Sequence, residues 1–378
     1  MMSAALTRAT IHHFRHELPV PIPTVMGPMT ARPALLLRLE DTEGAHGWGE
    51  IWCNFPPDGD FHRARLASRV LPAALAGMTT DTPDPFAEIL RRLHRLIIQC
   101  GEPGPVAQIA CAADIALHDM RARREGVPLA ELLGGRAAAV PAYASGISPD
   151  KASDQIQRMR ALGYRRFKQR IGFGPDDGIG AAEETGQSLA ADETLMLDAN
   201  QAWDLDTAMH RCGRLEKLDL VWLEEPMPAD APDDAWLSLS RIASMPLAGG
   251  ENLTGHALEG SVTLGALGVI QPDICKWGGL STTLKIARAA VAGGRIYCPH
   301  FLGGGVGLAA SAHLLSAVGG DGLLEVDSSE NPFIPVFSGR GLALEDGLFP
   351  VFDKPGLGFD PDVDALKDRL AQRLEVRL

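Results

Sequence analysis

The sequence predicts an α/β protein made of a (β/α)8 TIM-type barrel and an N-terminal α+β capping domain. The chain of 378 residues is longer than the ~100–200 residues of a usual single domain. Its first part reads as strands followed by helices, whereas from Val140 onward short apolar runs alternate with helix-length amphipathic stretches. Separate strands and helices are typical of an α+β domain, and regular alternation is typical of a parallel sheet.

The capping domain is expected over residues 1–135. It contains two β-rich runs and three helical patterns, at 34–40, 47–51, 61–75, 84–98 and 106–125. In the last pattern the apolar residues share one face, and Gly126 follows as a stop signal. A Leu-Leu-Gly-Gly run at 132–135 marks the junction with the next domain.

The barrel is expected over residues 136–340. Its eight apolar runs lie at 140–145, 166–170, 195–198, 221–224, 246–251, 268–272, 295–300 and 323–325. Eight strand–helix units in this length fit a slightly compact (β/α)8 barrel. The last segment, 341–378, holds another strand-like piece and an amphipathic end, and we expect it to pack back on the capping domain.

Composition narrows the classes of function. Hydrophobic residues make up 46% of the chain and charged residues 22%, which provides a sizeable core and argues against disorder. The formal net charge of -13 disfavours nucleic acid and anionic membranes as partners. No apolar run reaches ~18 residues and no signal-peptide pattern opens the chain, so we expect a cytoplasmic protein without a membrane span. The 6 cysteines are scattered without a CxxC pair, which indicates reduced thiols.

A polar or ionisable residue closes each of seven consecutive apolar runs. In order, these residues are Lys168, Asp198, Glu224, Glu251, Asp273, His300 and Glu325. The carboxyl ends of barrel strands meet on the face that carries the active site. One such residue is most often a turn former or a helix cap, but seven in series indicate a functional site.

Three of these residues predict a metal site. Asp198, Glu224 and Glu251 close adjacent runs, so their side chains are expected to converge on one sector of the barrel mouth. Without a cation, three close carboxylates repel and raise one another's pKa. Ligation by oxygen alone suits Mg²⁺ better than Zn²⁺. We therefore predict a Mg²⁺ site, for which Mn²⁺ is a substitute.

Asp273 and His300 close two further neighbouring runs and form a candidate general base. A carboxylate beside a histidine fixes the tautomer of the ring and raises its basicity. Lys168 is expected on the other side of the metal sector, and Glu325 is a candidate hydrogen-bond donor if it is protonated.

Over essentially its whole length the chain resembles the mandelate racemase/muconate lactonizing enzyme branch of the enolase superfamily. The motifs that carry the resemblance are the 114–119 helix segment, Asp198-x-Asn200, Leu223-Glu-Glu-Pro, Gln271-Pro-Asp, Cys298-Pro-His and the Pro-Gly-Leu-Gly run at 355–358. The metal-strand motif is the strongest of these, and the Asp273 and His300 motifs resemble the mandelate racemase subgroup.

The resemblance implies a half-reaction. Mg²⁺ binds a substrate carboxylate, a base removes the adjacent α-proton, and the metal stabilises the ene-diolate. Lys168 and a protonated Glu325 would meet the negative charge where it develops.

The second strand departs from the family pattern. Members usually carry Lys-x-Lys there with the second lysine as a base, whereas this chain has Lys168-Gln169-Arg170. Arginine keeps its proton and is a poor base, so Arg170 argues against two-base racemisation and leaves His300 as the single base and acid. Members with this arrangement are often acid-sugar dehydratases. We therefore predict a Mg²⁺-dependent lyase that converts an acid sugar to a 2-keto-3-deoxy acid.

Other outcomes stay open. A cation at Arg170 could lower the pKa of Lys168 and make it the second base of a racemase or epimerase. The Pro-His-x-x-Gly-x-Gly run from Pro299 is similar to members that cycloisomerise sugar lactones. A remote alternative is a catalytically inactive binding barrel. Another subgroup uses a sixth-strand lysine, but we interpret Lys276 as a loop or helix-start charge.

Substrate specificity is expected from two capping loops, 18–29 and 52–62. Trp52, Asn54, Phe55 and His62 are candidates there, each with loop packing as the alternative, and Asn200 is a candidate at the barrel. The expected partner is a small-molecule carboxylate. Because members of the family often associate, we also expect a homo-oligomer.

Overall fold

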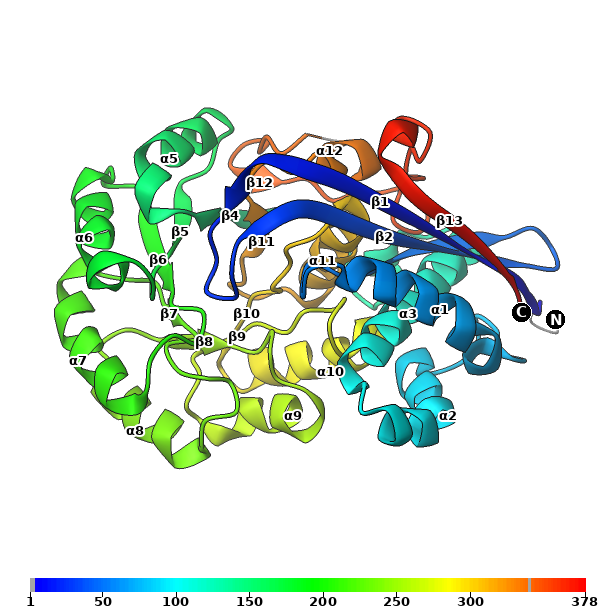
Figure 1. Ribbon diagram of the computed structural model, residues 1–378, viewed down its shortest axis with the longest axis horizontal. Coiled ribbons are helices and arrows are strands. Elements are labelled where there is room, and N and C mark those ends of the chain that lie inside the picture. Colours follow the sequence, from blue (N-terminus) through cyan, green and yellow to red (C-terminus); the bar gives the residue numbers. More distant parts are fainter. Residues whose placement is uncertain (1–3, 339–340) are drawn as a thin grey trace.

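The computed structural model describes residues 4–338 and 341–378, and its ribbon divides into a smaller α+β body and a larger barrel (Figure 1). The antiparallel capping sheet has the strand order β13-β1-β2-β3. Its strands are β1 (Leu6–Ile22), β2 (Met29–Asp41), β3 (His46–Ile51) and β13 (Leu370–Arg377). The two ends of the chain therefore meet in one sheet, as Figure 1 shows at the right of the molecule.

Strand β2 is apolar on both faces because both faces are covered. Leu35 and Leu37 belong to a cluster with the capping helices, whereas Leu36 packs in the cluster that the barrel side chains form. The capping helices are α1 (Gly59–Leu75), α2 (Pro85–Cys100) and α3 (Pro103–Glu125). A strand buried on both faces reads as a continuous hydrophobic run.

The close contact between β3 and α3 depends on two glycines. A Cβ at Gly47 would lie 2.0 Å from the carbonyl oxygen of Ala116, and a Cβ at Gly49 would lie 2.0 Å from that of Ala112. Because neither glycine carries a Cβ, the alanine-rich face of α3 can lie directly on the strand.

The barrel strands are parallel and follow the order β10-β9-β8-β7-β6-β5-β4-β11. Their bounds are β4 (Val140–Ile147), β5 (Arg166–Arg170), β6 (Thr194–Asp198), β7 (Leu223–Glu224), β8 (Leu247–Gly249), β9 (Val269–Ile270), β10 (Ile296–Tyr297) and β11 (Leu324–Asp327). Among the described residues no backbone ladder joins β10 to β11. The Leu323 N–H donates to Cys298 Sγ at 3.3 Å and links them instead.

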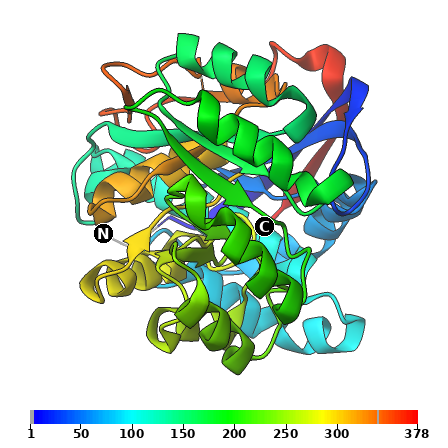
Figure 2. The ribbon, with the colours of Figure 1, turned by 90° about the vertical axis from the view of Figure 1, so that its left-hand side faces the viewer.

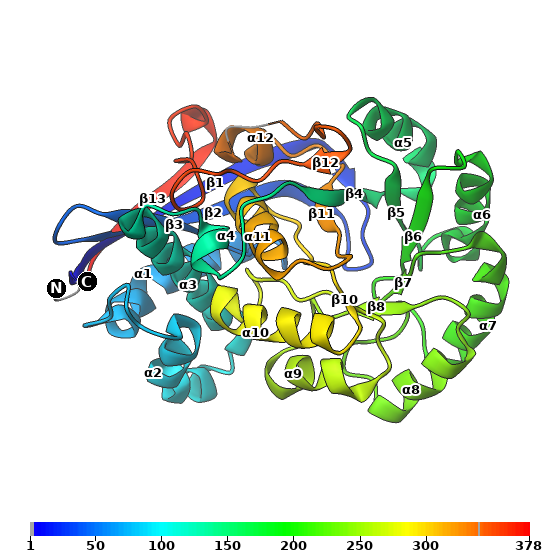
Figure 3. The same ribbon diagram turned by 180° about the vertical axis from the view of Figure 1, so that it is seen from behind.

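Each barrel strand is followed by a helix, so the predicted strand–helix rhythm is confirmed. The helices are α5 (Ala152–Ala161), α6 (Ile179–Ser188), α7 (Leu205–Leu215), α8 (Asp233–Ile242), α9 (Gly255–Leu264), α10 (Gly279–Ala292), α11 (Gly305–Val318) and α12 (Phe333–Ser338). The green helices lie outside the strands in Figure 2. Helix α10 packs against α3 and α11 lies beside β3 at the capping domain (Figure 3).

The interior of the barrel has an apolar floor beneath a polar layer. Met196, Trp222, Ala248 and Cys298 belong to one buried cluster. Because side chains alternate along a strand, the residue two positions further on points to the same side. That residue is Asp198 after Met196 and Glu224 after Trp222, so the alternation places the predicted acids above the floor.

Several strand boundaries differ from the prediction. Strand β8 ends before Glu251 because Gly250 adopts φ 140 and turns the chain. Strand β10 ends before His300 because Pro299 has no N–H to continue a ladder. Strand β11 does not close at Glu325 but continues to Asp327, which stays in register with Ser145 of β4.

The first capping loop is also shorter than predicted. Half of the 18–29 segment belongs to strands β1 and β2, which leaves a turn at residues 23–28. Strand pairing resumes at Ile22, opposite Met29. In Figure 1 the hairpin extends across the barrel toward β4.

The remaining elements are short. They are α4 (Leu129–Leu132), β12 (Leu348–Phe349), η1 (Pro149–Lys151), η2 (Pro175–Gly178), η3 (Glu216–Leu218) and η4 (Lys367–Arg369). Strand β12 pairs antiparallel with β4, after which the chain returns to the capping sheet as β13. Within residues 4–338 and 341–378 no helix has the length and apolarity needed to cross a bilayer.

Candidate active site

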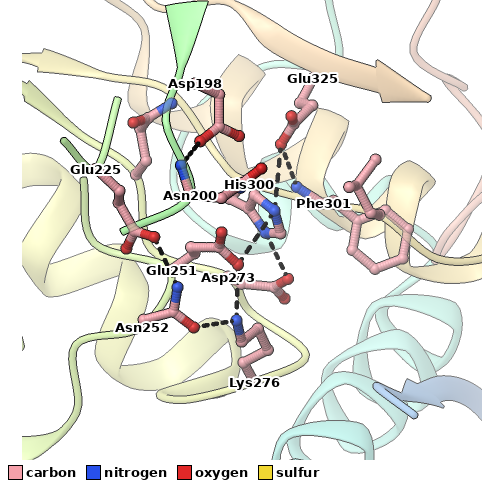
Figure 4. Close-up of polar contacts among 12 residues, drawn as sticks. Asp198, Asn200, Glu225, Glu251, Asn252, Asp273, Lys276, His300, Phe301 and Glu325 are labelled. Atoms are coloured by element: carbon pink, nitrogen blue, oxygen red, sulfur yellow. Dashed lines mark hydrogen bonds and ion pairs between the residues drawn. The ribbon is translucent and has the colours of Figure 1, made fainter. Parts of the chain in front are cut away.

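A cavity of about 170 Å³ lies where the β1–β2 turn and the segment after β3 meet the carboxyl ends of the barrel strands. Eight residues predicted from the sequence line it: Trp52, Asn54, Phe55, Arg170, Asp198, Asn200, Glu251 and His300. Four further predicted residues, Lys168, Glu224, Asp273 and Glu325, are at most 2% exposed. Figure 4 shows the polar contacts on the side of the site that carries His300.

Asp198 and Glu251 are the two predicted metal ligands on the cavity wall. Asp198 Oδ1 accepts the Asn200 N–H at 2.9 Å, in a turn where Asn200 has φ 46. Glu251 Oε2 lies 2.6 Å from Lys276 Nζ and 3.2 Å from His300 Nε2. Burial raises the pKa of Asp198, Lys168 opposes this, and Glu251 adds to it. A bound cation would relieve this carboxylate repulsion.

Glu224, the third predicted ligand, lies in the barrel interior and is paired with Lys168. The distance from Lys168 Nζ to Glu224 Oε1 is 2.6 Å. Glu224 Oε2 accepts from Gln271 Nε2 at 2.7 Å and from Trp222 Nε1 at 3.1 Å. Both of its oxygens therefore already have donors.

The three predicted ligands are accordingly not gathered as one cluster. Across the residues that the structure describes, no three His, Cys, Asp or Glu side chains form a group that could hold a metal ion. Glu225, the next residue after Glu224, lines the cavity, and its Oε2 accepts from Asn252 Nδ2 at 2.8 Å. Glu225 Oε1 is buried without a hydrogen-bond partner. Carboxylate oxygens of this kind are the donors that a hard divalent cation prefers.

Lys168 is a buried ammonium at the centre of the polar layer. Its Nζ lies 2.6 Å from Glu224, 2.8 Å from Glu325 and 3.5 Å from Asp198. Burial lowers the pKa of Lys168, but Glu224 and Glu325 outweigh it and hold that pKa well above its usual value. Lys168 therefore carries its charge at neutral pH and balances the acids around it.

His300 and Asp273 form a buried pair. His300 Nδ1 lies 2.9 Å from Asp273 Oδ2, and Asp273 Oδ1 accepts the Cys275 N–H at 2.7 Å. The second ring nitrogen, Nε2, faces Glu251 and the cavity (Figure 4). Burial lowers the pKa of His300, but Glu251, Glu325 and Asp273 raise it to about 10. Asp273 thus fixes the ring with Nε2 toward the cavity.

Glu325 is surrounded by donors, which differs from the donor role predicted for it. Its Oε1 accepts from Ser145 Oγ at 2.6 Å and lies 2.8 Å from Lys168 Nζ, and its Oε2 accepts the Phe301 N–H at 2.9 Å. Burial raises the pKa of Glu325, but the cations Lys168 and His300 bring it below the usual value. These contacts fit an ionised carboxylate that accepts hydrogen bonds and do not fit a protonated donor.

Arg170 lines the cavity and connects the barrel with the capping domain. It donates to the carbonyl oxygens of Pro23 at 3.2 Å and Gly146 at 3.3 Å. Nearby, Arg32 of β2 and Asp327 of β11 form a buried ion pair at 2.9 Å. Arg32 therefore neutralises Asp327, and the guanidinium of Arg170 faces the cavity as a fixed cation.

The capping-loop candidates divide into two groups. Trp52, Asn54 and Phe55 line the cavity, and Asn54 Nδ2 donates to the Leu302 carbonyl at 2.5 Å. His62 is instead exposed and 2.8 Å from Glu102, so the loop-packing alternative applies to it. A lone histidine close to a catalytic loop in sequence need not point to the site.

Lys276 lies in a turn, as predicted, but its side chain reaches into the cavity. Its Nζ contacts Glu251 and lies 2.7 Å from Asn252 Oδ1 and 5.0 Å from the Trp52 ring centre. The interpretation of Lys276 as a loop or helix-start charge fits its place in the chain, and the structure adds that its side chain borders the cavity.

Several site residues were missed by the sequence interpretation. They are Arg32, Glu225, Asn252, Gln271 and Asp327. Glu225 and Asn252 directly follow predicted ligands, and Gln271 precedes Asp273 by two positions, so strand alternation could have indicated it. Nothing in the sequence pairs Arg32 with Asp327, because that contact joins two domains.

Comparison with protein families confirms the resemblance. Residues 7–134 match the mandelate racemase/muconate lactonizing enzyme N-terminal domain, and residues 151–365 match the enolase C-terminal domain-like family. The chain therefore belongs to the mandelate racemase/muconate lactonizing enzyme branch of the enolase superfamily, and it is an enzyme of that superfamily.

Individual relatives catalyse different reactions. D-galactarolactone cycloisomerase of Agrobacterium fabrum is 29% identical over 96% of this chain and 98% of its own. L-talarate/galactarate dehydratase of Salmonella typhimurium is 33% identical over 74% of this chain and 69% of its own. A structure of that dehydratase with Mg and L-lyxarohydroxamate is 25% identical, covers 100% of this chain and 95% of its own, and has a TM-score of 0.86. A mandelate racemase/muconate lactonizing enzyme of Bordetella bronchiseptica RB50 is 45% identical with a TM-score of 0.88, over 97% of this chain and 99% of its own.

Proposed function

We propose that this enzyme removes the proton α to the carboxylate of an acid sugar and dehydrates the sugar to a 2-keto-3-deoxy acid. The observation that carries the proposal is the Asp273–His300 pair, whose second ring nitrogen, Nε2, faces Glu251 and the cavity that Asp198 and Glu251 border. A base beside a set of carboxylates is the equipment needed to abstract a weakly acidic α-proton.

The proposed metal is Mg²⁺, for which Mn²⁺ is a substitute, and the proposed ligands are Asp198, Glu224 and Glu251. When bound, such a cation neutralises the substrate carboxylate and the negative charge that proton removal adds to it. Asp198 and Glu251 already border the cavity. Glu224 is paired with Lys168, and it would give up that ion pair to bind the cation. The magnesium-bound structure of the related dehydratase supports the choice of metal.

His300 is the proposed base and acid, because the Glu251 charge that holds the pKa of His300 up is a charge that the proposed cation would neutralise. Asp273 holds the imidazole through Nδ1, so Nε2 is the nitrogen that takes the α-proton. The same nitrogen returns a proton to the β-hydroxyl as it departs, which balances the elimination of water. Lys168, an ammonium beside Glu224 and Glu325, is the donor that can meet charge on the substrate carboxylate.

Arg170 is the observation that favours a lyase over a racemase. A racemase needs one base on each face of the α-carbon, and a guanidinium does not accept a proton at neutral pH. Arg170, Trp52, Asn54 and Asn200 are proposed to bind and orient the substrate, because all four line the cavity.

Cycloisomerisation of a sugar lactone is the second candidate. It is favoured by the 29% identity to D-galactarolactone cycloisomerase, which extends over 98% of that enzyme. This reaction also begins at the carbon next to a carboxylate, so the same His300 would serve it.

The deciding experiment is NMR of the reaction in D₂O with a panel of acid sugars and their lactones in the presence of Mg²⁺. The proposal predicts a 2-keto-3-deoxy acid from an active acid sugar. Recovered substrate with an inverted α-carbon, deuterated there and without keto-deoxy acid, would identify a racemase. A ring-opened product from a lactone alone would identify the cycloisomerase.

A further inference from the structure

The chain after His300 forms a glycine-rich turn that begins α11. The main-chain N–H groups of Gly304 and Gly307 in this turn both donate to the carboxylate of Glu50, the second at 2.8 Å. Glu50 lies near the end of β3 in the capping domain and is 3% exposed. One capping-domain carboxylate therefore holds both ends of the turn.

The glycines make this contact close. A Cβ at Gly304 would lie 2.8 Å from Glu50 Oε1, and a Cβ at Gly303 would lie 3.0 Å from the same oxygen. Other side chains at these positions would push the carboxylate away from the turn, so the turn sequence and Glu50 fit one another.

Further contacts fix the residues between His300 and α11. Glu325 accepts the Phe301 N–H, and the Leu302 carbonyl accepts from Asn54. Both Glu50 and Asn54 belong to the capping domain, at the end of β3 and just after it. The path of the chain from His300 onward is thus determined largely by the other domain.

We propose that Glu50 is a positioning residue that holds the loop of His300 so that the imidazole keeps its place between Asp273 and the cavity. This inference rests on the proposed role of His300 as the base. Glu50 does not line the cavity, so it acts through the turn. The nearest turn residue that it contacts, Gly304, lies four positions after His300 in the chain. Misplacement of a reacting group by about 1 Å can cost roughly 10²-fold in rate.

The first test is Glu50→Gln in the full-length enzyme with Mg²⁺. The amide keeps the shape of the side chain but replaces one acceptor oxygen with a donor that opposes a main-chain N–H. We expect kcat for α-proton exchange to fall roughly 10²-fold, while KM and the Mg²⁺ concentration for half-maximal activity stay close to those of the parent enzyme.

Asp119→Asn is the matched control. Asp119 is also a buried capping-domain carboxylate that accepts two main-chain N–H groups, from Trp48 at 2.9 Å and Leu357 at 2.7 Å. These N–H groups lie in the capping sheet and the C-terminal segment, and the Arg123 guanidinium of α3 also donates to Asp119 at 3.0 Å, so none of its partners belongs to the His300 turn. Both substitutions should lower the unfolding temperature, but only Glu50→Gln should lower kcat.

Gly304→Ala tests the same contact from the other side. The added methyl group crowds Glu50 Oε1, whereas the backbone of Gly304, with φ -92, is one that alanine can adopt, so a folded Gly304→Ala enzyme should also lose kcat. Equal kcat losses in Glu50→Gln and Asp119→Asn, or parent-like kcat in both Glu50→Gln and Gly304→Ala, would overturn the inference. His300→Asn distinguishes the failure of this inference from the failure of the proposed function. If His300→Asn retains α-proton exchange, the proposed base is wrong. If His300→Asn abolishes exchange while Glu50→Gln and Gly304→Ala keep it, only the role of Glu50 fails.

Discussion

Lys168 should stabilise the protein strongly when Mg²⁺ is absent. Its ammonium lies within 3.5 Å of three carboxylates, those of Glu224, Glu325 and Asp198, and is 1% exposed. The substitution Lys168→Met keeps a long apolar side chain and removes the charge, so the acids of the polar layer lose the cation that balances them.

The expected cost follows from this burial. Removing one partner of a buried ion pair costs about 3–5 kcal/mol, because an uncompensated charge is left inside. The matched control is Arg91→Met, which removes a cation whose side chain is 71% exposed beside Glu88. Exposed pairs of that kind contribute little, so Arg91→Met should keep the free energy of unfolding close to that of the parent enzyme.

The assay is equilibrium urea unfolding, followed by tryptophan fluorescence, with EDTA and with saturating Mg²⁺. Lys168→Met should lower the free energy of unfolding by about 3–5 kcal/mol in EDTA. Mg²⁺ should offset part of this loss, because a divalent cation supplies the positive charge that the variant lacks. A loss below about 1 kcal/mol, or the same loss with and without Mg²⁺, would refute this reasoning.

Three further outcomes are expected. Loss of a residue that only supports a metal ligand typically weakens metal binding ~10–100-fold. In titration calorimetry Glu224→Gln should weaken Mg²⁺ binding by more than this, and Glu225→Gln should not exceed it. Equal losses of Mg²⁺ affinity in the two variants would contradict the assignment of Glu224. Arg170→Lys places a titratable amine opposite His300, so NMR in D₂O should detect substrate with an inverted α-carbon. If no inverted substrate forms, the argument that Arg170 denies the enzyme a base on the second face of the α-carbon is weakened. Burial lowers the pKa of His313 from 6.5 to about 4, so the folded state binds fewer protons than the unfolded state between these values. His313 should therefore contribute a loss of about 2 kcal/mol in stability from pH 7 to pH 5, and His313→Gln should remove that contribution; an unchanged pH dependence in the variant would exclude His313 as a source.

The sequence predicted the positions of the acids well because strand alternation is a local property. Asp198 and Glu224 stand two residues beyond buried floor residues, so the register of β6 and β7 alone determines which way they point. The ends of β8 and β10 were predicted less well, because Gly250 and Pro299 shorten those strands.

Partners across domains could not be predicted in the same way. The contacts of Glu50 with Gly304, 254 residues apart, and of Arg32 with Asp327 depend on how the capping domain lies on the barrel. The contact of Lys276 with Glu251 could not be predicted for a related reason, since it depends on the turn after β9. Glu325 was misread because its donors Lys168, Ser145 and Phe301 come from three different segments.

The most direct test of the account is exchange of the substrate α-proton in D₂O by His300→Asn, measured by NMR with Mg²⁺ and an acid sugar that the parent enzyme converts. His300→Asn should lose roughly 10²–10⁴-fold in exchange rate, the usual contribution of a general base, while Mg²⁺ binding stays near that of the parent. Exchange at close to the parent rate would contradict the account and would leave Lys168 or Lys276 as the base.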